Sequence, residues 1–184
     1  FQALLLDCRT LTYEHVAIPE SARFAIADTG ASRALATSAY NTRVHECLTA
    51  AQQLGVTALR DVTSINTTDA LPAPLNSRAR HVVSEIERAR RMAAALRTSD
   101  LEQCGSLMNA SHESLRRDFE VSSPALDNLV ERARTVPGVL GARLTGAGFG
   151  GHAIALTAPL ALRRLRSEWV QLRAVAPAHG ARVG

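Results

Sequence analysis

The sequence contains no lysine, and all of its 21 Lys or Arg residues are arginines. A P-loop needs a lysine that reaches the terminal phosphates of a nucleotide, and the glycine-rich loop of a protein kinase needs one on a following strand. A Schiff-base mechanism needs the amine of a lysine side chain. The absence of this one residue type therefore excludes three classes of enzyme.

Cysteines and aromatic residues are also scarce. The three cysteines, Cys8, Cys47 and Cys104, are far apart and form no CxxC pair, which argues against a disulfide framework and favours a reducing compartment, the cytoplasm. The six histidines form no HExxH motif, so we predict no metal ligands in this chain. Aromatic residues make up 4% of the chain, too few for a platform that stacks single-stranded nucleic acid.

No apolar run approaches the length that crosses a bilayer, so we expect no membrane as partner. The net charge of +4 comes from arginines spread along helical faces rather than gathered in a block, so we expect no nucleic acid as partner either. With 184 residues, 46% of them hydrophobic, the chain has the composition of one globular domain. It begins at Phe1 inside an apolar run, which leads us to expect a segment of a longer protein.

Hydrophobic periodicity divides the chain into strands, then helices, then strands again. We predict a third helix that begins at a capping box of Ser99 and Glu102, and a fourth that begins at Ser123 and Pro124. This order favours an α+β fold, an antiparallel sheet with helices packed mainly on one face. The other expected elements are strands at 3–6, 13–18, 24–27 and 170–174, helices at 40–54, 82–96 and 159–165, and a connector at 62–77.

The most distinctive stretch is GARLTGAGFGG at residues 141–151, which is followed by an alternating apolar segment at 152–157. Glycine at this density marks left-handed turns or a backbone that approaches a ligand closely. Gly146, Gly148 and Gly151 satisfy G-x-G-x-x-G, but that dinucleotide motif must open a helix, and here a second strand follows. We therefore predict two strands joined by a glycine loop, and a tight hairpin without a ligand stays open as the alternative.

Three polar side chains stand out in the expected elements. Asp7, next to Cys8 and Arg9 at the end of a strand, has the pattern of an acid in a structural salt bridge with a neighbouring arginine. His112 lies one residue off an apolar helix face, which favours a structural role over a catalytic one. Tyr40 begins the apolar stripe Tyr40, Val44, Cys47, Ala51, Leu54, so its register favours a core tyrosine, although its place in the first helical turn also suits contact with a ligand.

Five segments, in order and over nearly the whole chain, resemble the galactokinases, a family of GHMP small-molecule kinases. They are ALLLDCRTL at 3–11, SAYNTR at 38–43, RARHVVSE at 78–85, SHESLRRDFEVS at 111–122 and the glycine run at 141–151. The likeness is to the carboxyl-terminal half of such an enzyme. It implies the ferredoxin-like carboxyl-terminal domain of the GHMP kinases for residues 23–184. Residues 1–22 would then be a strand pair at the edge of an amino-terminal lobe.

The resemblance implies phosphorylation of galactose at its anomeric hydroxyl, with ATP and Mg²⁺ bound mainly by the amino-terminal half. Tyr40 matches a tyrosine that contacts the sugar. The loop with Gly146, Gly148, Gly150 and Gly151 matches the third family motif, on the phosphate side of the active site. The first motif, the serine-rich phosphate loop and the catalytic aspartate have no counterpart here, so the resemblance assigns no catalytic residue to this chain.

The sequence departs from the family at Ala39, where an acid is common, at Ala147, often a glycine, and at His152, usually a cysteine. These substitutions keep open a sugar sensor or partner-binding module without catalysis. A kinase for a related sugar such as N-acetylgalactosamine is also open. We expect the 184 residues alone to be inactive, and to associate with themselves through strands that lack their partner lobe.

Overall fold

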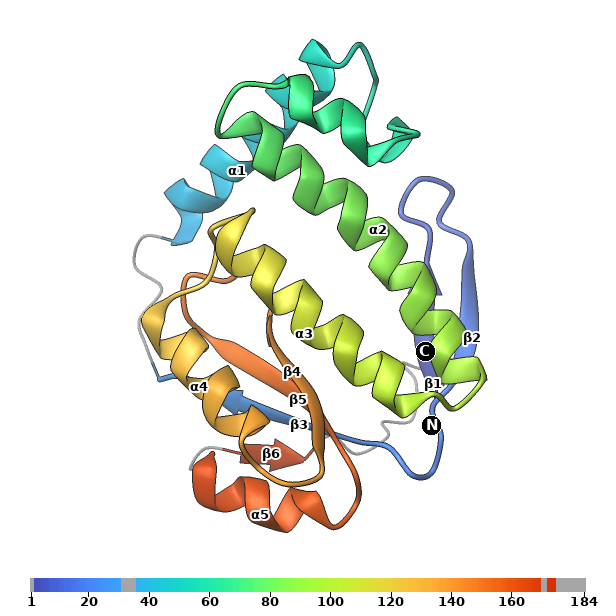
Figure 1. Ribbon diagram of the computed structural model, residues 1–184, viewed down its shortest axis with the longest axis vertical. Helices are drawn as coiled ribbons and strands as arrows, with labels where there is room; N and C mark the ends of the chain where they lie inside the picture. The colour runs from blue at the N-terminus through green and yellow to red at the C-terminus, as the bar shows by residue number, and fades with distance from the viewer. Residues whose placement is uncertain (1, 31–35, 170–171, 175–184) are drawn as a thin grey trace, which may run out of the picture.

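The computed structural model describes residues 2–30, 36–169 and 172–174, and it has the mixed class that the sequence predicts (Figure 1). Two sheets are present in these ranges. One is a hairpin of β1 and β2, and the other is a four-stranded antiparallel sheet in the order β4-β5-β3-β6. The elements are β1 Gln2–Leu6, β2 Tyr13–Ala17, β3 Arg23–Asp28, α1 Ala36–Gln53, η1 Leu59–Asp61, η2 Ile65–Ala70, α2 Leu75–Arg97, α3 Leu101–Arg117, α4 Pro124–Arg134, β4 Val139–Thr145, β5 His152–Thr157, α5 Ala161–Glu168 and β6 Leu172–Ala174.

The four-stranded sheet is built around β5, which pairs with β4 on one side and with β3 on the other. Ile154 of β5 faces Arg143 of β4 and Ile26 of β3. The closing strand β6 pairs antiparallel with β3, as expected, although Val170 and Gln171 of the predicted strand lie outside the described residues. The antiparallel sheet of the sequence prediction is therefore confirmed.

One face of this sheet is formed by alanines, which allow a helix to approach the strands closely. Helix α4 packs there through Val130 and Ala133, and Trp169 closes the cluster after α5. The Trp169 indole donates to the Leu129 carbonyl at 2.8 Å, so its one polar group is satisfied. The alanines of the cluster are Ala25, Ala27, Ala142, Ala153 and Ala155.

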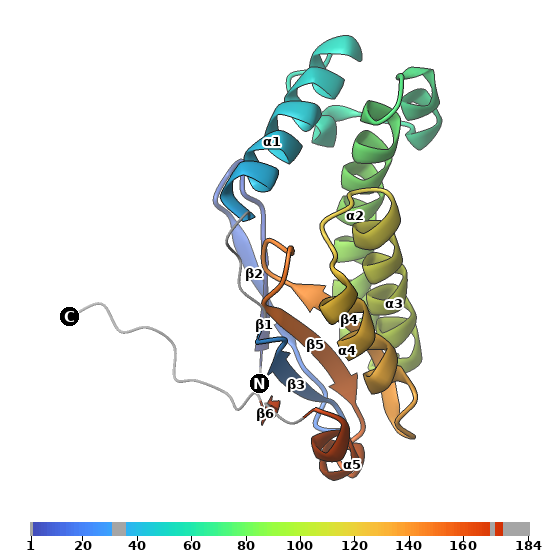
Figure 2. The ribbon, with the colours of Figure 1, turned by 90° about the vertical axis from the view of Figure 1, so that its left-hand side faces the viewer.

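Helix α3 lies along β4, the edge strand of the sheet, and α2 lies beyond it (Figure 2). Gly105 of α3 and Gly141 of β4 touch backbone to backbone, and a Cβ at either position would overlap with the other element. The outward N–H groups of β4 are not left unpaired. Ala142 donates to the Asn109 side chain at 3.0 Å and Leu144 donates to His112 Nδ1 at 3.3 Å. A helix thus covers an edge that would otherwise be open to another chain.

The β1–β2 hairpin packs with one face on α2. Val16 lies in a core cluster with Ala93 and Leu96, and Ala3 and Leu5 pack against the same cluster. The tip of the hairpin is held by two ion pairs, Asp7–Arg60 and Arg9–Asp61, each at 2.8 Å. The bond from Arg60 is the main cause that lowers the pKa of Asp7 far below its usual range. The predicted structural salt bridge of Asp7 forms, but its partner is Arg60, while Arg9 beside it in sequence pairs with Asp61.

Two expectations about helices are wrong. Ser99 has a left-handed φ of 57° and ends α2, so α3 is capped by Asp100, whose carboxylate accepts from the Gln103 N–H at 2.9 Å. The capping box that we predicted at Ser99 therefore does not form. The predicted connector at 62–77 contains η2 and the first residues of α2. Within the described ranges, no helix has both the length and the apolar character needed to span a membrane.

Candidate functional site

The glycine loop joins β4 to β5, as predicted, and does not open a helix. Its backbone is left-handed at all four candidate glycines, with φ of 85° at Gly146, 82° at Gly148, 125° at Gly150 and 84° at Gly151. Phe149 shares this conformation at 60°. Glycine is the residue that adopts such angles without steric cost. The predicted hairpin is confirmed, while a role of the loop at a ligand stays a prediction.

The loop is fixed by hydrogen bonds in its middle and at its carboxyl-terminal end. The Phe149 N–H donates to the Val121 carbonyl at 2.7 Å, and the Val121 carbonyl lies so close to Gly148 that a Cβ there would overlap with it. At the carboxyl-terminal end, the Thr29 N–H donates to the Gly151 carbonyl at 2.7 Å, and the Gly151 N–H donates to the Thr29 hydroxyl at 3.1 Å. Gly146 differs, because nothing lies within 4 Å of its Cβ position. The open side of the loop is therefore at Gly146.

His152 follows the loop at the start of β5 and pairs across the sheet with Asp28. His152 Nε2 lies 3.6 Å from Asp28 Oδ2, and both side chains are partly exposed. Asp28 also accepts from the Gly30 N–H at 3.0 Å. A histidine and a carboxylate thus stand at the mouth of the glycine loop, where the family resemblance leads us to expect a cysteine.

Tyr40 is not a core residue, so the interpretation from its register is wrong. It is 52% exposed, and Val44 and Leu48 on the same stripe of α1 are exposed as well. The stripe is buried only in the second half of α1, where Ala50 and Ala51 enter a core cluster with α2. The first turns of α1 extend past that cluster, which leaves Tyr40 beside an open groove of about 480 Å³. Contact of Tyr40 with a ligand stays a prediction.

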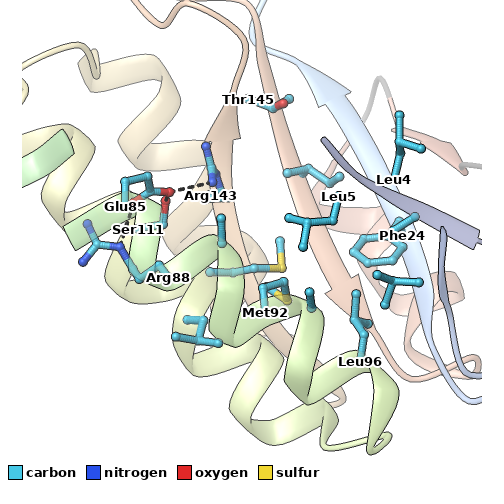
Figure 3. Close-up of a pocket in the computed structure, with 17 residues that line it drawn as sticks. Leu4, Leu5, Phe24, Glu85, Arg88, Met92, Leu96, Ser111, Arg143 and Thr145 are labelled. Atoms are coloured by element: carbon cyan, nitrogen blue, oxygen red, sulfur yellow. Dashed lines mark hydrogen bonds and ion pairs between the residues drawn. The ribbon is translucent and has the colours of Figure 1, made fainter. Parts of the chain in front are cut away.

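A second cavity, of about 430 Å³, lies between β1, α2 and the sheet face opposite α4 (Figure 3). Most of its wall is apolar, with Leu5, Phe24 and Met92 pointing into it. Its other end is polar and includes Thr145, the last residue before the glycine loop. The cavity therefore reaches from the hairpin β1–β2 to the loop.

The polar end of this cavity is organised by Glu85. Glu85 Oε1 accepts from the Ser111 hydroxyl at 2.6 Å and from Arg143 at 3.1 Å, while Oε2 accepts from Arg88 at 2.7 Å. Burial alone would raise the pKa of Glu85, but these bonds outweigh it and lower the pKa. Burial is also the main cause that lowers the pKa of Arg143. The sequence analysis missed this group, although an acid and an arginine inside apolar stretches of α2 and β4 were a signal for it.

Two buried histidines have structural partners. His112 accepts from the Leu144 N–H through Nδ1, and its Nε2 lies 3.3 Å from Asp127. The structural role predicted for His112 is confirmed. His81 Nδ1 lies 3.0 Å from the Ser114 hydroxyl, which donates to Asp118 at 2.7 Å.

The described residues do not supply a metal site. They contain no group of three His, Cys, Asp or Glu side chains that could hold an ion. Of the acids considered above, Asp28 lies at the glycine loop, and its partner there is His152.

Comparison with known proteins identifies relatives of the whole chain. Residues 92–171 match the family of the GHMP kinases C terminal. The chain is 46% identical over 177 residues to a galactokinase of Roseiflexus sp. (strain RS-1), which covers 92% of this chain and 45% of that protein. It is also 46% identical over 164 residues to a galactokinase of Chloroflexus aurantiacus, with 85% and 42% covered. The chain thus spans less than half the length of these curated relatives.

Solved structures of similar fold include a galactokinase and another small-molecule kinase. The crystal structure of Lactococcus lactis galactokinase complexed with galactose superposes with a TM-score of 0.86 at 36% identity, over 95% of this chain and 50% of that one. The mevalonate kinase of L. major, in complex with R-mevalonate, gives a TM-score of 0.57 at 24% identity over 92% and 47%. The second likeness shows a shared fold alone.

Proposed function

We propose that this chain, which matches the C-terminal domain of the GHMP kinases over residues 92–171 and is similar to the galactokinases over nearly its whole length, is the carboxyl-terminal part of a galactose kinase. The reaction would transfer the terminal phosphoryl group of ATP to the anomeric hydroxyl of galactose. The observation that carries this proposal is the 46% identity to a galactokinase across 92% of the chain. The exposed Tyr40 and the open side of the loop at Gly146 fit it.

In this proposal the two parts of the site have different tasks. The hydroxyl of Tyr40 binds the sugar, and the loop with Gly146, Gly148, Gly150 and Gly151 borders the phosphates. Backbone N–H groups of a turn can form a concavity that suits an anion. The N–H groups of Phe149 and Gly151 are bonded within the protein, so contact with a phosphate would be made on the Gly146 side of the loop. Phosphoryl transfer depends mainly on positioning and on stabilisation of charge, so a loop of fixed backbone is suited to this reaction.

We further propose that residues 1–22 form the edge of an amino-terminal lobe, and that residues 23–184 form the carboxyl-terminal domain. The separate pairing of β1 with β2 supports this division, because neither strand joins the four-stranded sheet. Leu4, Leu6 and Tyr13 are exposed on the hairpin, as expected for a surface that another layer covers.

ATP and Mg²⁺ would be bound mainly by the amino-terminal half of the enzyme, which would also supply the catalytic residues. Magnesium would neutralise charge on the phosphates there. We propose the cytoplasm as the location, in keeping with the free thiols of Cys8, Cys47 and Cys104. The 184 residues alone should form no measurable galactose 1-phosphate.

A chimera tests the proposal directly. The amino-terminal half of the Roseiflexus galactokinase is joined to this chain, and formation of galactose 1-phosphate from ATP is measured. Turnover with galactose supports the proposal. Binding of galactose and ATP without turnover would instead indicate a sensor, and a clear preference for N-acetylgalactosamine would indicate a different sugar kinase. A folded chimera that binds neither ligand would overturn the proposal.

The role of Tyr40 is tested in the same chimera by Tyr40→Phe. Loss of one hydrogen bond to the sugar should cost about 0.5–1.5 kcal/mol and raise the KM for galactose by about 2- to 13-fold. The free energy of unfolding should change by less than about 0.5 kcal/mol, because the side chain is largely exposed. The matched control is Tyr13→Phe, since Tyr13 is an exposed tyrosine of β2. Equal KM values in both variants would remove Tyr40 from the site.

A further inference from the structure

The turn at residues 118–121, directly after α3, connects two parts of the molecule through its backbone. Four consecutive carbonyls accept hydrogen bonds from other elements. Those of Asp118, Phe119 and Glu120 accept from arginines of α1 and α2, and that of Val121 accepts from the Phe149 N–H in the glycine loop. The turn therefore touches the helix of Tyr40 on one side and the glycine loop on the other.

The arginine side of this turn is buried and charge-balanced. Arg78 of α2 is only 2% exposed. It donates to the Asp118 carbonyl and to two carboxylates, Glu46 at 2.9 Å and Glu120 at 2.6 Å. Arg43 of α1 shares Glu46 at 2.9 Å and donates to the Phe119 and Glu120 carbonyls. Both arginines thus donate to carbonyls of the turn, and both donate to the same carboxylate, that of Glu46.

Arg43 matters because the core cluster that α1 joins does not reach the first half of this helix. The core cluster that α1 joins contains Ala50 and Ala51, with Cys47 and Leu54 against it. Those residues all belong to the second half of the helix or follow it. Arg43 lies one turn after Tyr40, so its bonds to the turn fix the part of α1 from which Tyr40 projects.

On its other side, the 118–121 turn packs closely against the glycine loop. Val121 packs with Phe119 and Phe149 in one core cluster, together with Leu126 and Leu144. The Val121 carbonyl also occupies the space in which a side chain at position 148 would lie. Glu120 keeps a left-handed φ of 52°, a conformation that persists in a non-glycine residue only where its surroundings enforce it.

Resting on the proposed function, we propose that the 118–121 turn is a spacer that sets the position of Tyr40 relative to the glycine loop, with Arg78 as its main positioning residue. Arg78 touches neither sugar nor nucleotide in this proposal. It acts by holding the turn and Glu46, and through them Arg43. If the hydrogen bonds of Arg78 to the turn and to Glu46 are weakened, the first turns of α1 should loosen. The glycine loop should stay in place, because β4 and β5 hold it in the sheet.

The first test needs no activity and uses the chain as it is. Glu120→Gln removes a charge partner of Arg78 from a side chain that is 58% exposed, so the protein should fold. Amide hydrogen exchange is then measured by NMR for the Phe149 N–H and for residues 40–46. We expect both to exchange faster, by about 2- to 30-fold, with β3 and β5 unchanged. Arg78→Lys should give the same pattern with a larger effect.

The matched control is Arg134→Lys. Arg134 also donates to two carbonyls, of Asn109 and Ala142, but these belong to α3 and β4 away from the turn. It should leave exchange of the Phe149 N–H and of residues 40–46 as in the unchanged protein. Faster exchange confined to residues 118–121 in Glu120→Gln and Arg78→Lys would overturn the proposal that the turn acts as a spacer.

The second test uses the chimera. Glu120→Gln and Arg78→Lys should raise the KM for galactose by about 2- to 30-fold, while the KM for ATP stays within about 2-fold. A purely structural role would lower the amount of active enzyme and leave both KM values alone. An inactive chimera whose exchange pattern is as expected would count against the proposed function but not against the spacer, so the two failures can be told apart.

Discussion

At the scale of single residues, the glycines of the loop differ in what their missing side chains permit. Gly146 and Gly148 have nearly the same left-handed φ, 85° and 82°. Space is open around Gly146, whereas the backbone of Val121 fills the space beside Gly148. The sequence showed that the loop would bend, but it did not show which glycine permits a contact inside the protein and which one is open to a ligand.

Replacing these two glycines by alanine separates the cost of a left-handed backbone from the cost of overlap with Val121. Gly146→Ala should cost about 1–2 kcal/mol of unfolding free energy, the price of a left-handed backbone with a Cβ. Gly148→Ala should cost clearly more, because the overlap with Val121 is added, and it should also break the bond from Phe149. Urea unfolding of both variants measures this difference. Equal losses would show that the Val121 contact contributes nothing.

His81 gives a second prediction at this scale, on pH. Its burial lowers its pKa from 6.5 to about 4, although Glu85 and Asp118 favour the proton. Between these values the unfolded chain binds a proton that the folded protein excludes. The free energy of unfolding should therefore be intact above pH 6.5 and should fall as the pH drops toward 4.

Urea unfolding at a series of pH values tests this. His81→Gln should reduce the slope of stability against pH in that window, by at most about 1.4 kcal/mol per pH unit for the one proton removed. The residual slope belongs to other groups, among them His112, whose pKa is also lowered by burial. An unchanged slope in His81→Gln would show that His81 does not titrate differently in the two states.

At the scale of elements, the sequence predicts what depends on local pattern. The glycine hairpin and the cap at Ser123 followed from neighbouring residues, and both are present. Partners distant in sequence could not be predicted in this way. Asp7 was expected in a salt bridge, but Arg60 became its partner only through folding. The exposure of Tyr40 depends on where α2 stops covering α1, and periodicity within one helix does not contain that information.

The contact of α3 with the edge of β4 supports a prediction about one side chain. Asn109→Ala would leave the Ala142 N–H without its acceptor beside a covered strand edge. An unsatisfied buried N–H costs about 1–3 kcal/mol, so unfolding should become easier by that amount. Asn128→Ala, at an exposed position of α4, is the control and should stay within about 0.5 kcal/mol. Similar losses of unfolding free energy in both variants would mean that the Ala142 N–H finds another acceptor.

At the scale of the whole molecule, most of the large exposed apolar side chains lie on the β1–β2 hairpin or on α1. Leu4, Leu6 and Tyr13 lie on the β1–β2 hairpin, and Val44 and Leu48 lie on α1 beside Tyr40. Isolated exposed apolar residues are common, but several of them on one element indicate a surface that a partner covers. The galactokinase relatives are about twice as long as this chain, so their amino-terminal half is the partner that we propose for it.

Without that half, the same surface should bind another copy of the chain. We expect the sedimentation coefficient of the 184-residue protein to rise with concentration, because exposed apolar side chains and a hairpin whose outer edges pair with no other strand among the described residues favour association. Leu4→Glu combined with Leu6→Glu should abolish the rise, since both side chains are exposed and charge opposes close approach of two copies. Leu160→Glu is the control, as Leu160 is also exposed but lies at the start of α5, away from this surface. A protein that stays monomeric at every concentration, or an equal effect of Leu160→Glu, would show that the hairpin is not an interface. The chimera adds an independent check, because the amino-terminal half should cover this surface and remove the concentration dependence without any substitution.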